Sequence, residues 1–257
     1  MAVAVMMRLD KFLADMGVGT RSEVKKLIKG GRVSVDGAVI KNEGFKVSEA
    51  MTVTCCGKDI SYVKEEYYML HKPSDVVSAT EDRKDKTVLD LIASKRRKDL
   101  FPVGRLDKDT EGLLLITNDG ALAHRLLSPK SHVPKVYYAK VLGEVTGEDI
   151  LKFADGLTIS NDFEALPAEL EVLSVQKEAD ECVSEITVKI YEGKFHQVKR
   201  MFETVGKRVL YLKRLSMGPL VLDEKLPCGA YRALTKEEIA ALFEAAGKEV
   251  NDGKGNV

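Results

Sequence analysis

The chain has 257 residues, of which 44% are hydrophobic, and its 40 basic and 40 acidic residues give a formal net charge of zero. This composition is typical of a folded globular protein, and the length allows one large domain or two smaller ones. The balanced charge excludes attraction of nucleic acid by a uniformly positive protein, so any such partner would be held by local basic patches.

Two further features narrow the class of protein. No apolar run approaches the roughly 18 residues of a membrane span, and the opening MAVAVMM lacks the basic start and the length of a signal peptide. We therefore expect a cytoplasmic protein without a membrane partner. The four cysteines show no C-x-x-C spacing and the four histidines are scattered, which argues against a disulfide framework or a structural zinc site.

The first fifty or so residues predict a small separate module. Apolar residues at helical spacing predict a helix over residues 9–16, ended by Gly17 and Gly19. Thr20 and Glu23 have the spacing of a capping box and predict the start of a second helix. Residues 32–40 then predict a hairpin with a tight turn at Asp36 and Gly37.

Basic residues follow one face of the second predicted helix. Arg21, Lys25 and Lys29 recur every four residues, and Lys26 lies beside them. Taken alone, such a row is most often a solvated helix face. Residues 7–53 as a whole, however, resemble an S4 domain, because the R-L-D start, the T-R-S helix entry and the G-R-V-S-V-D-G hairpin follow each other in that order. The resemblance implies that these four cations contact the phosphates of structured RNA, which provides affinity without sequence reading.

The rest of the chain predicts an α+β protein with a larger, mixed and mainly antiparallel sheet domain. We expect the S4 domain over residues 1–56, a polar linker over 57–66, a second domain over 67–250 and a frayed tail over 251–257. Within the second domain the pattern predicts strands at 67–70, within 71–80, and at 113–117, 137–142, 168–175 and 182–190. It predicts helices at 87–93 and 121–127, and helices capped by Thr146 and Thr235.

The chemistry is expected at residues 104–120, which read GRLDKDTEGLLLITNDG. Five charged residues precede a short apolar run of the kind found in a strand buried on both faces. So much charge beside a core strand is costly unless the loop reaches solvent or a ligand. A solvated turn with local Asp caps is the ordinary alternative.

A second charged stretch follows near the end of the chain. Between Gly193 and Arg214 there are seven Lys or Arg residues and a single acidic residue, Glu203. Such local basicity in a neutral protein is typical of a surface that meets an anionic partner.

Together these segments resemble the pseudouridine synthases, specifically the branch that modifies ribosomal RNA and carries an S4 domain in front. The match rests on GRLDKDTEGLLLITNDG, with HKPSDVVS, KVYYAKV and GKFHQVKRM as weaker elements, and the tail LDEKLPCGAYRALT is similar to the small-subunit rRNA branch. One departure is Asp75, which stands where glycine is usual, although Asp tolerates left-handed backbone better than most residues.

The resemblance implies roles for particular residues. Asp107 would be the catalytic aspartate, Tyr137 would stack on the target base, and Lys199 would be the cation paired with Asp107. Arg105 would take the place of the flipped nucleotide, with His196 and Arg200 as further RNA contacts. No cofactor or metal is implied, because reactant and product are isomers. The implied partner is ribosomal RNA or an assembling ribosomal subunit, bound by a monomer.

Alternatives remain open for the chain and for single residues. The protein could be a non-catalytic RNA-binding or ribosome-assembly factor, or a synthase acting on large-subunit rRNA. Asp107, Asp109 and Asp119 could instead bind a divalent metal for phosphodiester hydrolysis. Locally, Tyr137 could be a cross-strand aromatic, Lys199 a solvated cation and Arg105 a surface partner of Glu111.

Overall fold

The computed structural model describes residues 6–93, 96–160, 163–178 and 181–247. The chain forms two compact units. Unit 1 consists of Met1–Glu66 and Ala93–Leu100, and unit 2 consists of Tyr67–Ile92 and Phe101–Val257. Both combine helices with sheets in which all strand pairs but one are antiparallel, and this confirms the predicted α+β class. The predicted tail, residues 251–257, lies outside the described residues.

Unit 1 packs two helices against a four-stranded antiparallel sheet of order β3-β2-β5-β6, with β1 and β4 paired separately. The predicted capping box is confirmed, since Glu23 N donates to the Thr20 hydroxyl and Thr20 N donates to the Glu23 carboxylate. The predicted turn at Asp36 and Gly37 is confirmed by their positive φ angles of 48° and 82°. The elements are α1 (Leu9–Asp15), α2 (Arg21–Lys29), β1 (Met7–Arg8), β2 (Val33–Val35), β3 (Ala38–Val39), β4 (Lys46–Val47), β5 (Val53–Cys55) and β6 (Lys58–Ile60).

The structure differs from the linker that we predicted over residues 57–66. Strand β6 lies in this segment and pairs with β5 across a turn whose central residues, Cys56 and Gly57, have positive φ angles. Tyr62 then stacks on Phe12 of α1, with 5.3 Å between ring centroids. The segment is polar in sequence because most of its side chains are exposed or half-buried, so its composition resembles that of a linker.

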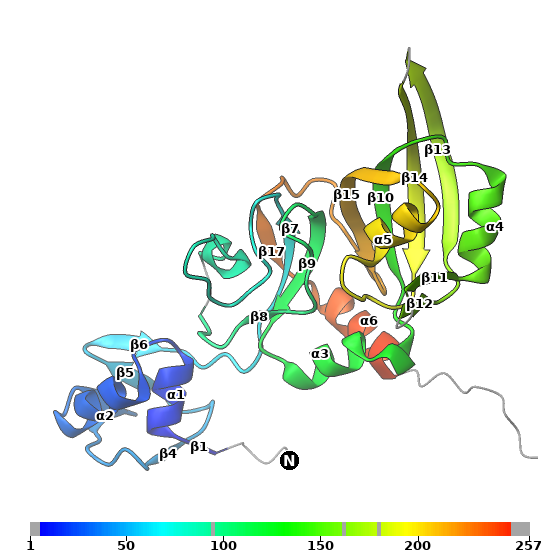
Figure 1. Ribbon diagram of the computed structural model, residues 1–257. Coiled ribbons are helices and arrows are strands. Elements are labelled where there is room, and N and C mark those ends of the chain that lie inside the picture. Colours follow the sequence, from blue (N-terminus) through cyan, green and yellow to red (C-terminus); the bar gives the residue numbers. More distant parts are fainter. Residues whose placement is uncertain (1–5, 94–95, 161–162, 179–180, 248–257) are drawn as a thin grey trace, which may run out of the picture. The chain divides into compact units, whose positions relative to one another are not determined.

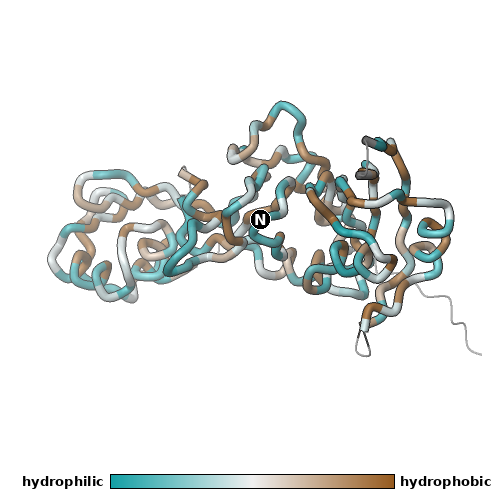
Figure 2. The backbone as a smooth tube through the Cα atoms, turned by 45° about the horizontal axis from the view of Figure 1, so that its top comes forward, coloured by the Kyte–Doolittle hydropathy of each residue, from teal (hydrophilic) through white to brown (hydrophobic). Residues whose placement is uncertain are grey.

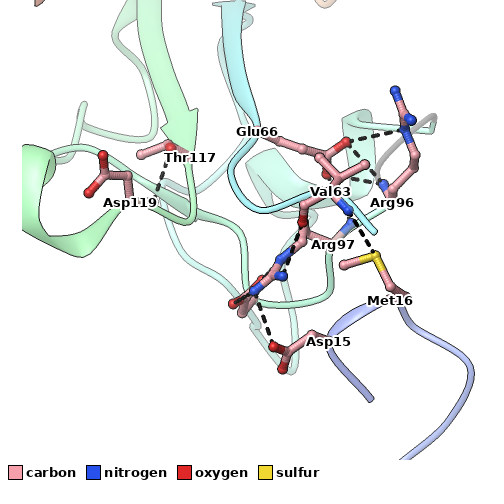
Figure 3. Close-up of polar contacts among 9 residues, drawn as sticks. Asp15, Met16, Val63, Glu66, Arg96, Arg97, Thr117 and Asp119 are labelled. Atoms are coloured by element: carbon pink, nitrogen blue, oxygen red, sulfur yellow. Dashed lines mark hydrogen bonds and ion pairs between the residues drawn. The ribbon is translucent and has the colours of Figure 1, made fainter. Parts of the chain in front are cut away.

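A short strap, residues 96–100, belongs to unit 1 although it lies far along the chain. The buried Arg97 side chain donates to the Asp99 carboxylate and the Val63 carbonyl, and its Nη2 lies 3.6 Å from Asp15. The backbone N–H groups of Arg96 and Arg97 donate to the Glu66 carboxylate (Figure 3). Because the strap is fixed here, the chain crosses between the units three times rather than once.

Unit 2 is built on a nine-stranded sheet, whose main path runs β13-β14-β10-β15-β9-β7-β17 (Figure 1). Strand β16 pairs with β15 and β8 pairs with β9, and β9–β15 is the one parallel strand pair among the described residues. Strands β11 and β12 form a separate two-stranded sheet. The strands are β7 (Tyr67–Lys72), β8 (Phe101–Pro102), β9 (Glu111–Thr117), β10 (Lys135–Leu142), β11 (Leu157–Ser160), β12 (Phe163–Ala165), β13 (Glu169–Glu178), β14 (Glu181–Ile190), β15 (Arg208–Met217), β16 (Leu220–Val221) and β17 (Tyr231–Ala233).

Leu122 and Leu242, from two of the helices, pack in one hydrophobic cluster with Leu115 of β9, the strand that the sequence predicts to be buried on both faces. Residues 113–117 of β9 are fully buried, as predicted. Figure 2 shows hydrophilic and hydrophobic residues alternating along the helices, as expected for elements with one packed face. The helices are α3 (Gly120–Leu127), α4 (Gly147–Asp155), α5 (Gln197–Thr204), α6 (Lys236–Gly247) and the 3₁₀ helices η1 (Val88–Leu91) and η2 (Pro129–Ser131).

The strand that we predicted within residues 71–80 is absent from the described structure. Strand β7 continues to Lys72, and the following segment is a loop with a single bridge between Val77 and Thr87. Pro73 cannot donate to a sheet, and Asp75 has a left-handed φ of 62°. The left-handed Asp75 is the geometry that the sequence allowed for at this position.

The start of β9 depends on Gly112. Its φ is +105°, and a Cβ atom there would overlap the backbone of Arg214 on β15. We expect Gly112→Ala to lower the free energy of unfolding by about 3 kcal/mol, because backbone strain and a backbone collision add. Gly120→Ala is the matched control, since nothing lies within 4 Å of its Cβ position, and it should be neutral or slightly stabilising. Thermal or denaturant unfolding measures the stability of both variants. Equal stability of the two would show that the start of β9 does not depend on Gly112.

Candidate active site

The candidate site is built on the loop between β8 and β9, residues 103–110, called here the β8–β9 loop. The hydroxyl of Ser78 donates to the Leu106 carbonyl and accepts from its N–H, with distances of 2.8 and 3.1 Å. Leu106 itself is buried. The loop is therefore anchored at its middle residue, and the flanking Arg105 and Asp107 are left partly exposed.

Lys72, the last residue of β7, lies beneath this loop and is fully buried. Its Nζ donates to the carbonyls of Pro73, Lys108 and Thr110 at 3.0, 3.1 and 2.8 Å. Burial lowers the pKa of Lys72 to about 8, although the nearby carboxylates, Asp109 and Asp107 first, act in the opposite direction. The ammonium group thus ties the second half of the β8–β9 loop, on both sides of Asp109, to the end of β7.

A second tie comes from the left-handed Asp75, whose N–H donates to the Lys108 carbonyl at 2.9 Å. The K-P-S-D segment therefore supports the β8–β9 loop through both a side chain and the backbone. Sequence reasoning assigned no role to Lys72. The available signal was a lysine at the end of a fully apolar strand, since a buried lysine needs hydrogen-bond acceptors.

A small pocket of about 50 Å³ opens beside Asp107. It brings together three segments that are far apart in the sequence: the β8–β9 loop, β10 and the start of α5. Tyr137 on β10 is buried and forms one wall, with Leu212 of β15 beside it. The lining residues are Arg105, Leu106, Asp107, Thr110, Tyr137, Ile190, Gly193, Lys194, His196, Gln197, Val198 and Leu212.

Lys199 on α5 lies between two carboxylates. Its Nζ is 3.1 Å from Asp107 Oδ2 and 2.6 Å from Asp109 Oδ1. Burial lowers the pKa of Lys199, but its hydrogen bonds to the two carboxylates raise the pKa by more. Burial alone would raise the pKa of Asp109, but the hydrogen bond and the charge of Lys199, together with smaller contacts, act in the opposite direction, so that this pKa lies below the usual range. The cation is shared, which the sequence did not indicate.

The two carboxylates differ in their surroundings. The Asp107 side chain is 23% exposed and lines the pocket, whereas that of Asp109 is 68% exposed and does not. His196 adds a second contact, since its Nε2 lies 3.5 Å from Asp107 Oδ1. Asp107 is therefore the carboxylate that a molecule bound in the pocket would meet.

Two other predicted site residues lie in different surroundings. Arg105 is exposed at the mouth of the pocket and is not paired with Glu111, which instead accepts from the Tyr211 hydroxyl at 2.6 Å. Arg200 does not line the pocket. Its guanidinium group lies 3.3 Å from the Ser160 hydroxyl and 4.8 Å from the centre of the Phe163 ring.

The metal-binding alternative fails on geometry. Asp119 accepts from Leu122 N at the start of α3 and from the Tyr67 hydroxyl, both at 2.9 Å. It therefore follows the end of β9 opposite to Asp107 and Asp109, about 20 Å away for a strand of this length. These three carboxylates cannot bind one ion. No other group of three His, Cys, Asp or Glu side chains suited to a metal occurs among the described residues.

Unit 1 carries a separate basic hollow of about 740 Å³. Arg21 and Lys25 of the predicted row line it, whereas Lys26 and Lys29 do not. Lys25 and Lys29 lie 3.5 and 3.3 Å from the carboxylate of Glu43, so part of the row is neutralised within the domain. The sequence did not indicate the other cations of this hollow. The basic side chains that line it are Arg8, Lys11, Arg21 and Lys25.

No helix in the described parts of the chain has both the length and the apolar character needed to cross a bilayer.

Comparison with known proteins gives consistent matches to both units. Residues 66–204 match the family model of RNA pseudouridylate synthase, and residues 7–53 match the S4 domain. An uncharacterized RNA pseudouridine synthase of Bacillus subtilis is 47% identical, over 93% of this chain and 99% of its own. The ribosomal small subunit pseudouridine synthase A of Vibrio cholerae is 41% identical, over 93% of this chain and 100% of its own.

A solved structure agrees with these matches. The crystal structure of a pseudouridylate synthase superposes with a TM-score of 0.63 at 34% identity, covering 92% of this chain and 99% of that one.

The buried Lys72 predicts a dependence of stability on pH. Because its pKa is about 8 in the folded protein and has an ordinary value of 10.5, the unfolded chain binds more protons between these pH values. The free energy of unfolding of the wild type should therefore rise relative to that of Lys72→Met between pH 8 and 10.5, by up to about 3 kcal/mol. Urea unfolding of both proteins across this range measures the difference. Parallel pH profiles would show that the ammonium group is not desolvated.

Proposed function

The chain belongs to the RNA pseudouridylate synthase family, and we propose that it isomerises a uridine of small-subunit ribosomal RNA with Asp107 as the catalytic carboxylate. One observation carries this proposal. A carboxylate and an arginine of the β8–β9 loop, Asp107 and Arg105, line a single pocket together with an aromatic ring of β10, Tyr137. The three residues are those that the family resemblance names for attack, for stacking and for filling the gap in the RNA.

The reaction explains why these side chains are useful together. Conversion of uridine to pseudouridine breaks the bond between N1 of uracil and C1′ of ribose, rotates the base, and forms a bond from its C5 to C1′, while the C5 proton moves to N1. An ionised carboxylate can act as nucleophile or base toward the nucleotide. Lys199, 3.1 Å from Asp107, pairs with this carboxylate and orients it.

The pocket favours a nucleotide that has left its helix. A base inside a stacked helix is out of reach of a side chain, so the target must be flipped out and held by an aromatic face. Tyr137 would supply that face. Arg105 is exposed at the mouth of the pocket, and its long cationic side chain suits the space that the flipped nucleotide leaves.

Two observations support small-subunit rRNA as the substrate. Several similar proteins, including the one from Vibrio cholerae, are named ribosomal small subunit pseudouridine synthase A. The S4 domain of this chain carries a basic hollow suited to structured RNA. A non-catalytic RNA-binding role would give no reason to keep Asp107, Tyr137 and Lys199 together at a pocket.

Replacement of Asp107 tests the proposal. Asp107→Asn keeps the size of the side chain but removes its charge, so we expect a folded protein that binds rRNA and makes no detectable pseudouridine. The measurement is a nucleotide-resolution map of pseudouridine in unmodified small-subunit rRNA after incubation with each protein. The same map made with large-subunit rRNA distinguishes the two substrates, and turnover in EDTA tests any metal requirement.

Asp109→Asn is the matched control, because it removes a neighbouring carboxylate that contacts the same lysine but does not line the pocket. It should retain activity within about tenfold of the wild type. Full activity of Asp107→Asn together with loss of activity in Asp109→Asn would show that Asp109, and not Asp107, is the catalytic carboxylate.

The S4 row tests RNA binding separately. Changing Lys25, Lys26 and Lys29 to Ala should weaken rRNA binding and flatten its salt dependence by up to about one unit of log–log slope per lost phosphate contact. Glu43→Gln should act in the opposite direction, because it releases Lys25 and Lys29 from their internal partner. Fluorescence or filter-binding titrations at several salt concentrations measure both variants. An unchanged slope in both would show that this helix face does not meet RNA.

A further inference from the structure

Phe195 lies beside the candidate active site with its ring 71% exposed, although it is one of eight phenylalanines in a chain whose core is well packed. Large apolar side chains are exposed singly on many proteins and then need no explanation. Phe195 differs because it stands at the edge of a charged pocket, between Lys194 and His196. A side chain at this position is well placed to contact a molecule bound at the pocket.

The ring is held in a defined orientation. It stacks on the imidazole of His196, with 3.7 Å between ring centroids and 19° between planes. His196 in turn lies 3.5 Å from Asp107 and has a left-handed φ of 49°. With one face of the Phe195 ring covered by His196, so large an exposed fraction means that the opposite face is open.

The turn that carries Phe195 is braced from within. Lys194 N donates to the side-chain oxygen of Gln197 at 3.0 Å, and the buried Gln197 donates through Nε2 to Glu192 at 2.7 Å. Lys194 Nζ donates to the Glu164 carbonyl at 3.0 Å. The open face of the ring is therefore presented by a fixed turn, which lowers the entropy lost when a flat partner binds.

A groove of about 710 Å³ runs past this ring and is continuous with the pocket. The two share Arg105, Leu106, Asp107, Gly193, Lys194 and His196. Beyond the shared residues the groove has apolar walls formed by Val77, Ala79, Pro102, Leu127 and Phe195. It is thus a continuation of the pocket that has room for a further nucleotide.

The charges of the groove favour a nucleic acid. Lys108 is neutralised by Asp85 at 2.8 Å and Lys194 lies 3.5 Å from Glu192, whereas Arg105 has no ion pair with any residue in the described ranges. Asp107 is the sole acidic residue that lines the groove, and it is paired with Lys199. An unpaired arginine between apolar walls suits a nucleic acid, which presents flat bases together with negative charge.

We propose that Phe195 stacks on the base of a nucleotide directly adjacent to the target uridine, and that the groove holds this neighbour while the target occupies the pocket. The inference rests on the proposed function, because the pocket must hold a flipped uridine for the groove to hold its neighbour. An aromatic face accepts any base, so the contact gives affinity and register rather than sequence reading.

A cycle of protein and RNA changes tests the stacking. The RNA is a synthetic fragment of small-subunit rRNA around the uridine found by mapping, with its natural sequence or with an abasic nucleotide on the 5′ or the 3′ side of the target. Phe195→Ala should weaken binding of the natural RNA about 10- to 100-fold. At one of the two abasic positions, removal of the base should cause a similar loss of affinity in the wild type and little further loss of affinity in Phe195→Ala.

Control variants separate stacking from other effects. Phe195→Tyr keeps the aromatic face and should bind like the wild type, whereas Leu151→Ala removes an equally exposed apolar side chain of α4 outside the groove and should change nothing. If Phe195 acts only by orienting His196, then Phe195→Ala should lower kcat equally with natural and abasic RNA and leave affinity unchanged. That result would overturn the proposal.

The remaining outcomes are also decisive. The stacking would be overturned if the losses of affinity caused by Phe195→Ala and by the abasic nucleotide were additive at both the 5′ and the 3′ position. It would also be overturned if Phe195→Ala bound the natural RNA as tightly as a wild type that makes pseudouridine. Either result would leave the proposed function standing. Absence of pseudouridine in any rRNA treated with the wild type would instead remove the proposed function, and the stacking with it.

Discussion

The buried ammonium group of Lys72 is the contact on which the candidate site depends. It donates hydrogen bonds to the carbonyls of Pro73, Lys108 and Thr110, and so holds the charged turn that contains Asp107 against the end of β7. The same turn brings acidic side chains near the cation, and their field partly offsets the cost of its burial. Lys72 thus fixes the loop on both sides of Asp109, and Ser78 fixes it at Leu106, so that Asp107 lies between two anchored residues.

Lys199 adds the second constraint, and it acts from the opposite side. Because one lysine contacts both Asp107 and Asp109, charge alone does not distinguish the two carboxylates. Position does, since Asp107 lines the pocket with Tyr137 while Asp109 points into solvent. Asp109 thus has a contact of its own, because it holds Lys199 through a carboxylate that does not line the pocket.

The features that the sequence predicted correctly are those set by local chemistry. The capping box of Thr20 and Glu23 and the turn at Asp36 and Gly37 depend on neighbours within a few residues, and the apolar run of β9 is contiguous in the chain. The features it missed depend on distant partners. Strand β6 has a polar composition and becomes a strand by pairing with β5, and the strap around Arg97 is fixed by Asp15 and Glu66.

The candidate site shows the same division. Asp107, Tyr137 and Lys199 could be predicted because a family resemblance carries information about tertiary contacts that residue patterns lack. The ties beneath the loop, the sharing of Lys199 and the direction of Arg200 toward Ser160 and Phe163 required coordinates. Since the site is assembled from three segments on different strands and a helix, no window of the sequence contains it, and its chemistry appears only when the sheet brings these segments together.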